Sequence, residues 1–122
     1  MSKTILVVED TVDTRELLHL YLTKEGFTVI TAADGGEGLY RANTDHPDLI
    51  ISDFNLPNLS GLDLIKQLRD EPEFAKIPII AITAYGKDFS EVARSAGANE
   101  TMQKPFEFEA LVAVVKSLLK QS

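Results

Sequence analysis

Apolar and polar residues follow two different periods along this chain, and the repeated change of period predicts strands that alternate with helices. Five short runs have the length of strands, and three of them are continuously apolar. Continuous apolar character indicates strands that are covered on both faces, as in a parallel sheet. The predicted strands are residues 5–8, 29–32, 49–52, 79–82 and a weaker fifth run at 100–103.

Helical periodicity fills the intervals between these runs, where apolar residues recur three or four positions apart. One such stripe, predicted to belong to the core, is Phe89, Val92 and Ala93. This pattern predicts an α/β fold of the doubly wound (βα)₅ type. It contains a five-stranded parallel sheet with right-handed crossovers and helices on both faces.

Residues with reactive or charged side chains follow four of the five predicted strands. In chain order they are Glu9, Asp10, Asp53, Thr83 and Lys104. The carboxyl ends of parallel strands meet at one edge of a sheet, and open α/β sheets bind their ligands there. We therefore expect these side chains to converge, although they are far apart in sequence.

Three carboxylates at one edge predict a bound cation. Two carboxylates about 4 Å apart repel each other by roughly 4 kcal/mol at an effective dielectric near 20. Such a group either takes up protons or holds a positive ion. Oxygen ligands favour a hard ion, and room for water favours Mg²⁺ over Ca²⁺, with Mn²⁺ as a possible substitute. The alternative for each acid alone is that it caps a helix or faces water, as most loop acids do.

Composition narrows the possible classes of protein. The 122 residues fit one domain, 1–122. Cysteine is absent, which excludes disulfides and thiolate metal sites. The net charge of −7 and the pI of about 4.7 argue against direct binding of nucleic acid. The first apolar run is too short for a signal peptide or a membrane span, so we expect a cytoplasmic protein without membrane insertion.

Four segments, in order and at the ends of the expected strands, resemble the receiver domain of two-component response regulators. They are Val7-Val8-Glu9-Asp10, Asp53-Phe54-Asn55-Leu56-Pro57 with Gly61, Ile82-Thr83-Ala84, and Lys104-Pro105-Phe106. The resemblance covers essentially the whole chain. It implies a flavodoxin-like sheet with strand order 2-1-3-4-5 and a stand-alone receiver without an output domain.

The resemblance also implies a role for each site residue. Asp53 would accept a phosphoryl group in a Mg²⁺-dependent reaction. The implied metal ligands are Glu9, Asp10, Asp53 and the backbone carbonyl of Asn55. The implied phosphoryl-binding residues are Thr83, Ala84 and Lys104, and the peptide bond before Pro105 is implied to be cis.

The phosphoryl donor implied by the resemblance is a histidine kinase or a histidine phosphotransfer protein. The chain would assist its own phosphorylation and dephosphorylation, but it would be a signalling protein and not an enzyme. It would signal through the surface of the fourth helix, fifth strand and last helix, or act as a relay intermediate. Thr101 stands where this family usually has Tyr or Phe, so we expect Thr101, Tyr85 or backbone motion alone to serve the switch.

Two other classes share parts of this pattern. A Mg²⁺-dependent phosphohydrolase of the haloacid dehalogenase type would use Asp10 as nucleophile, but it needs a second Asp where this chain has Val12. An FMN-binding flavodoxin needs a hydroxyl-rich phosphate loop, whereas residues 34–38 are acidic. We interpret residues 34–38 as a turn and a helix cap.

Overall fold

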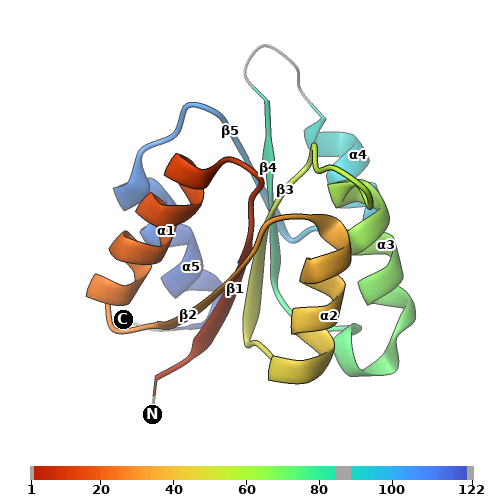
Figure 1. Cartoon of the computed structure of the whole chain (residues 1–122), viewed down its shortest axis with the longest axis horizontal. Helices are drawn as coiled ribbons and strands as arrows, with labels where there is room; N and C mark the ends of the chain where they lie inside the picture. The colour runs from red at the N-terminus through yellow and green to blue at the C-terminus, as the bar shows by residue number, and fades with distance from the viewer. Residues whose placement is uncertain (1, 85–88, 121–122) are drawn as a thin grey trace.

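Strands and helices alternate along the part of the chain that the structure describes, residues 2–84 and 89–120 (Figure 1). The structure is a computed structural model. Its elements are β1 (Thr4–Val8), α1 (Val12–Lys24), β2 (Thr28–Ala32), α2 (Gly35–Asp45), β3 (Leu49–Asp53), α3 (Gly61–Asp70), the 3₁₀ turn η1 (Pro72–Phe74), β4 (Ile79–Thr83), α4 (Ser90–Ala96), β5 (Glu100–Gln103) and α5 (Phe108–Leu118). The predicted alternation is confirmed, and every predicted strand lies within an observed one.

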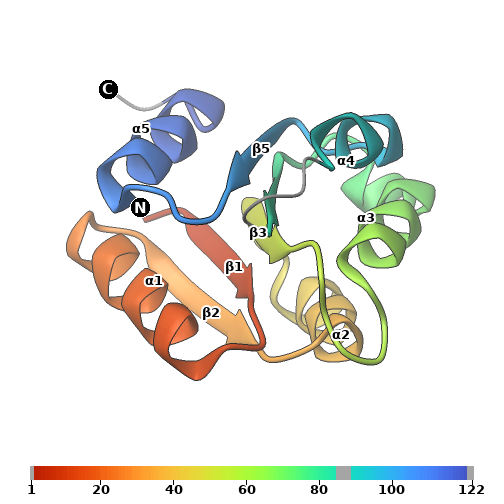
Figure 2. The same ribbon diagram turned by 90° about the horizontal axis from the view of Figure 1, so that it is seen from above.

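The strands form one parallel sheet in the order β2-β1-β3-β4-β5. Seen from above, α1 and α5 cover one face of the sheet, and α2, α3 and α4 cover the other (Figure 2). The strand order is the one that the resemblance implies, and the predicted doubly wound fold is confirmed. All the carboxyl ends of the strands therefore meet at the same edge.

The two faces of the sheet bury two separate hydrophobic cores. Side chains of a strand point alternately to opposite faces. On β4, Ile79 and Ala81 pack in the core under α3 and α4, whereas Ile80 and Ile82 pack in the core under α1 and α5. Every residue of β3 and β4 is buried. This burial on both faces explains why those strands read as continuous apolar runs.

Reciprocal hydrogen bonds at the start of α2 confirm the interpretation of residues 34–38 as a turn and helix cap. The Asp34 carboxylate accepts a hydrogen bond from the Glu37 backbone N–H at 2.8 Å, and the Glu37 carboxylate accepts one from the Ala33 N–H at 2.7 Å. This arrangement is similar to a capping box, except that Glu37 binds the amide of Ala33, one residue before the N-cap Asp34. The acidic residues 34–38 thus form the N-terminal cap of α2.

The core prediction for α4 holds for two of its three residues. Ala93 is fully buried, and the Phe89 ring stacks on the Phe54 ring with centroids 5.4 Å apart. Val92 is 46% exposed, so its assignment to the core was wrong. Successive residues of a helix lie about 100° apart around its axis, and only one side of the short α4 faces the sheet.

Within residues 2–84 and 89–120, no helix combines the length and the apolar character that a membrane crossing requires.

Candidate functional site

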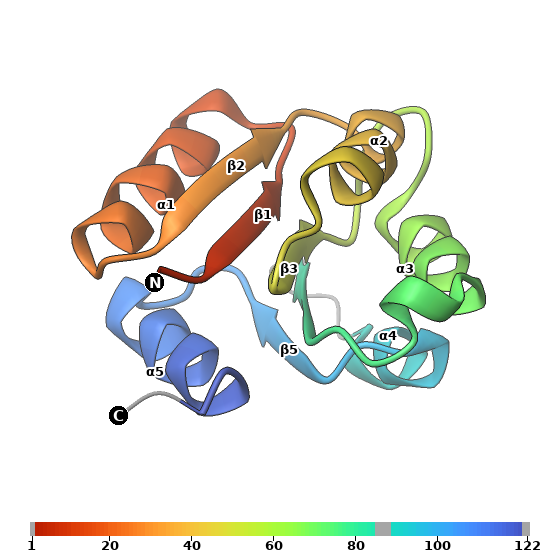
Figure 3. The same ribbon diagram turned by 90° about the horizontal axis from the view of Figure 1, so that it is seen from below.

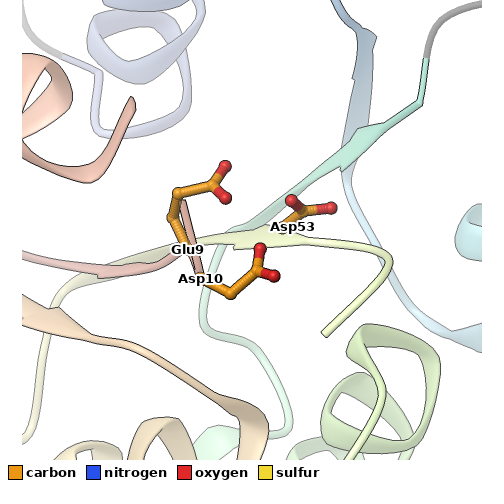
Figure 4. A group of neighbouring side chains, drawn as sticks. All are labelled: Glu9, Asp10 and Asp53. Carbon is orange, nitrogen blue, oxygen red and sulfur yellow. The ribbon is translucent and has the colours of Figure 1, made fainter. Parts of the chain in front are cut away.

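Three carboxylates gather at the carboxyl edge of the sheet. Glu9 and Asp10 follow the last residue of β1, and Asp53 is the last residue of β3. The two strands are neighbours, with Val8 paired to Ser52. One oxygen from each of the three carboxyl groups lies within 4.8 Å of the other two, and Figure 4 shows the side chains close together. The predicted convergence of the acids is confirmed.

The Lys104 side chain contacts two of these acids. Its Nζ lies 3.0 Å from Oδ2 of Asp53 and 3.0 Å from Oε1 of Glu9. The Lys104 backbone N–H donates to the carbonyl of Thr83 at 2.9 Å, which continues the β4–β5 ladder past the end of β5. The peptide bond between Lys104 and Pro105 is cis, as the resemblance implies. The sheet register thus places an ammonium group over the carboxylates.

Backbone amides hold the two buried acids in position. Oδ1 of Asp53 accepts from the Asn55 N–H at 3.0 Å, and Oε2 of Glu9 accepts from the Thr11 N–H at 3.0 Å. The Arg15 guanidinium donates to the backbone carbonyl of Glu9 at 2.8 Å. Neither Thr11 nor Arg15 was predicted to be a site residue, because nothing in the local sequence pattern shows that either contacts Glu9.

The pKa values of Glu9 and Lys104 are both raised above their ordinary values. Glu9 is only 1% exposed, and this desolvation raises its pKa, with a further contribution from the negative charge of Asp53. The Thr11 amide and the Lys104 ammonium oppose that increase. Burial acts to lower the pKa of Lys104, but its hydrogen bond to Asp53 and its charge interactions with both Asp53 and Glu9 outweigh this effect, and the pKa is raised.

One buried acceptor in the site lacks a hydrogen bond. Among the described residues, Oε1 of Glu9 is buried without a hydrogen-bond partner, because its contact with Lys104 is close enough for an ion pair but lacks hydrogen-bonding geometry. A buried carboxylate oxygen without a donor is costly. A divalent cation among the three carboxylates would satisfy it with ligands of the oxygen type that hard ions prefer. The residues present therefore fit a metal ion.

The other predicted site residues on β4 and β3 lie beside this cluster. Thr83 is the last residue of β4 and is 2% exposed, and the half-buried Ala84 follows it. Asn55 is exposed in the loop after β3, with its N–H directed at Asp53. The structure brings these residues to the same edge as the acids.

The two residues expected to serve the switch are placed differently. Thr101 is half-buried on β5, and its Cα pairs with that of Ala81, so it lies before the carboxyl end of the strand. Tyr85 lies outside the described residues. The expectation for Thr101 therefore concerns a position within the edge strand β5, two residues before its carboxyl end.

Gly61 allows the loop after β3 to fold closely against the end of that strand. A Cβ atom at this position would lie 2.2 Å from the backbone oxygen of Asp53, which is too close for any side chain. The Gly61 N–H donates to the Phe54 carbonyl at 3.0 Å and closes the loop. This close approach gives a physical reason for the glycine in the motif.

A doubly wound sheet whose carboxyl edge carries an acidic cluster, a threonine and a lysine defines a receiver-type site. The model of the response regulator receiver domain family matches residues 5–116. The chain belongs to this family, which confirms the resemblance.

Individual relatives agree with that assignment. The alkaline phosphatase synthesis transcriptional regulatory protein PhoP of Bacillus subtilis is 42% identical over 100% of this chain, which spans about half (50%) of the length of PhoP. The polar-differentiation response regulator DivK of Brucella ovis is 35% identical, with 98% of each chain covered. Among solved structures, the receiver domain of the sensor histidine kinase PA1611 of Pseudomonas aeruginosa PAO1 has a TM-score of 0.91 and 28% identity. The match covers 99% of this chain and 100% of that one, and the solved structure has a magnesium ion coordinated in its active site cleft.

The family assignment does not favour the phosphohydrolase alternative. At the position where that class needs its second Asp, Val12 is 52% exposed at the start of α1. The flavodoxin alternative is not favoured either, because the acidic loop at residues 34–38 caps α2.

Proposed function

We propose that Asp53 accepts a phosphoryl group and that this chemistry drives the signalling of the receiver. The observation that carries the proposal is the contact of Lys104 with Asp53 inside a group of three carboxylates. An Asp53 oxygen attacks the phosphorus of a phosphohistidine, so a P–O bond forms while the P–N bond breaks. The imidazole leaves with the electron pair and takes up a proton.

The contacts of Asp53 favour one of its oxygens as the nucleophile. Oδ1 accepts the hydrogen bond of the fixed Asn55 amide, whereas Oδ2 accepts that of the Lys104 ammonium. Lysine is a point charge on a flexible stem, and its side chain here is 30% exposed. Lys104 can therefore leave Oδ2 and follow the negative charge onto a phosphoryl oxygen, which frees Oδ2 to attack.

We assign a Mg²⁺ site, with Mn²⁺ as a substitute, to the carboxylates of Glu9, Asp10 and Asp53 and the backbone carbonyl of Asn55. The clustering of the three acids supports this assignment, as does Oε1 of Glu9, which is buried without a hydrogen-bond partner among the described residues. The magnesium ion of the PA1611 receiver domain supports it as well. When bound, the metal offsets the negative charge of the incoming phosphoryl group, which the acids alone would repel.

Receiver domains exchange phosphoryl groups with histidine kinases and phosphotransfer proteins, and we assign such a protein as the donor. The Thr83 hydroxyl would donate to a phosphoryl oxygen, and the small Ala84 would leave room for the phosphoryl group. Together with Lys104, these residues would assist both addition and removal of the group. Thr83 leads toward α4, and Lys104 lies between β5 and α5. The surface formed by α4, β5 and α5 is therefore the proposed output surface.

Intact mass after incubation with acetyl phosphate or phosphoramidate and Mg²⁺ tests this function. We expect one added phosphoryl group in the wild type and none in Asp53→Asn. Asp63→Asn changes an exposed acid in the first turn of α3 and is the matched control, which should still be modified. Hydrolysis of a phosphoester without an adduct, lost in Asp10→Asn but retained in Asp53→Asn, would contradict the proposal.

A further inference from the structure

A side-chain hydrogen bond connects the end of β5 to the residue that follows Thr83. Gln103, the last residue of β5, donates from Nε2 to the backbone carbonyl of Ala84 at 3.2 Å. The next residue, Lys104, donates its backbone N–H to the carbonyl of Thr83. Two consecutive carbonyls at the end of β4 are thus held by two consecutive residues of the neighbouring chain segment.

These two hydrogen bonds differ in kind. The bond to Thr83 belongs to the backbone ladder. The bond to Ala84 comes from an exposed side-chain amide and extends the contact one residue beyond the end of β4 at Thr83. A hydrogen bond of this kind contributes only about 0.5–1.5 kcal/mol. The hydrogen bond from Gln103 to the Ala84 carbonyl is therefore a weak restraint on the backbone directly after β4.

The register of the sheet indicates that the backbone at Thr83 and Ala84 must move for Thr83 to bind a phosphoryl group on Asp53. Asp53 pairs with Ile82, and Ile82 packs in the core under α1 and α5. Alternation along β4 places the next side chain, that of Thr83, on the opposite face. For the Thr83 hydroxyl to reach a group on Asp53, the backbone at Thr83 and Ala84 has to shift.

We propose that Gln103 is a positioning residue that holds the backbone at Ala84 in its resting position and so lowers the receiver's affinity for a phosphoryl group. The proposal rests on the phosphoacceptor function of Asp53. By alternation, Gln103 lies on the same face of the sheet as Thr101 and Thr83, opposite Met102, which packs with the α1 and α5 core. The carbonyl of Ala84 cannot follow Thr83 toward Asp53 without stretching or breaking its bond to Gln103.

The thermodynamic consequence is a shift between two populations. A ligand that binds only the shifted conformation has an apparent affinity reduced by the fraction of molecules in that conformation. Removing the Gln103 hydrogen bond should raise that fraction and tighten binding by roughly two- to tenfold, the equivalent of one such bond. The affinity for Mg²⁺ alone should stay unchanged, because strand alternation places Gln103 on the face of the sheet opposite to Asp53.

Calorimetry with two probes tests the proposal. Wild type and Gln103→Met are titrated with Mg²⁺ alone, and then with beryllium fluoride, an analogue of the phosphoryl group, in saturating Mg²⁺. Methionine keeps the length of the side chain but has no amide donor. Gln67→Met, an exposed position on α3, is the matched control.

We expect tighter binding of beryllium fluoride in Gln103→Met, unchanged Mg²⁺ binding in both variants, and wild-type values throughout in Gln67→Met. A purely structural defect would weaken both probes. Equal or weaker beryllium fluoride binding in Gln103→Met, with normal wild-type binding, would overturn the role of Gln103 alone. Failure of the wild type itself to bind beryllium fluoride would overturn the phosphoacceptor function, and the role of Gln103 with it.

Discussion

Glu9 is the residue at which the functional site conflicts most directly with folding. Its side chain is almost fully buried, it lies beside Asp53, and one of its oxygens has no hydrogen-bond donor among the described residues. Without a metal, the charged form of this carboxyl is disfavoured. The Lys104 ammonium opposes this effect, and a metal ion among the carboxylates would oppose it further.

The pH dependence of stability should report this conflict. Because the folded-state pKa of Glu9 is raised above the ordinary value of 4.5, its contribution to the free energy of unfolding is complete below that pH. The contribution is lost as the pH rises through the folded-state pKa. We expect metal-free Glu9→Gln to be more stable than the wild type at neutral pH, by about 1.4 kcal/mol for each unit of the shift. The difference should shrink toward pH 4.

Urea unfolding in a chelating buffer measures this difference. The pH runs from about 4, near the ordinary carboxyl pKa, to about 8. Glu109→Gln replaces an exposed acid at the start of α5 and is the matched control. A difference between Glu9→Gln and wild type that does not vary with pH would show that burial of Glu9 does not destabilise the metal-free fold.

Gly61 is a second residue at which the site restricts the sequence. Gly61→Ala should lower the free energy of unfolding by about 1–3 kcal/mol, because the new methyl group would meet the Asp53 backbone oxygen and force the loop away from β3. Phosphorylation of Asp53 should slow as well. Urea unfolding and the intact-mass assay measure the two effects.

Gly36→Ala is the matched control for this change. A Cβ at Gly36 makes only an ordinary contact of 3.4 Å with Asp34, and the position lies inside α2. Alanine there should be neutral or stabilise the fold by about 0.5–1 kcal/mol. Equal effects of the two substitutions would contradict the packing argument at Gly61.

Among the elements, the Arg69 side chain links α3 to the connection between α4 and β5. Arg69 lies near the end of α3, and its Nη1 donates to the carbonyl of Phe74 at 2.8 Å. Its Nη2 donates to the carbonyl of Gly97 at 2.7 Å and to Oδ1 of Asn99 at 2.9 Å. Its burial lowers its pKa. Seen from below, α3 and α4 lie side by side at this end of the sheet (Figure 3). The end of α4 far from Asp53 is thus held to α3 by hydrogen bonds of the Arg69 side chain.

Loss of this anchor should destabilise the whole domain. Arg69→Met leaves the carbonyls of Phe74 and Gly97 without their donor, and we expect a loss of about 2–4 kcal/mol in the free energy of unfolding. Arg94→Met removes an exposed arginine that pairs with Glu100 at 3.0 Å, and it should cost at most about 1 kcal/mol. Urea unfolding compares the two. Equal costs would mean that the Arg69 hydrogen bonds contribute no more than a surface pair.

For the whole molecule, the site adds to an already acidic chain. The chain has nineteen Asp and Glu residues and twelve Lys and Arg residues, which gives the net charge of −7. Any cation screens this charge, but only an ion held by the three carboxylates binds the folded state specifically. Metal binding and global stability should therefore be linked.

Addition of Mg²⁺ should raise the unfolding temperature of the wild type in a concentration-dependent way. The stabilisation grows by about 1.4 kcal/mol for each tenfold excess over the dissociation constant. Asp10→Asn, which removes an exposed carboxylate proposed as a ligand, should lose this dependence while staying folded. NaCl at matched ionic strength controls for screening in scanning calorimetry. An equal response of wild type and variant would exclude Asp10 from the metal site.

The sequence by itself determined the alternating elements and the placement of Glu9, Asp10, Asp53 and Lys104 at strand ends. Periodicity reports local burial, and parallel strands bring their carboxyl ends to one edge. The resemblance added the strand order and the roles of these residues.

Tertiary structure alone decided which side chains contact one another. The reach of Arg15 to the Glu9 carbonyl, of Arg69 to Gly97 and of Gln103 to Ala84 depends on how helices and neighbouring strands pack. The exposure of Val92 depends on the same packing. Long polar side chains find partners through the relative positions of whole elements, and the period of a single segment does not contain that information.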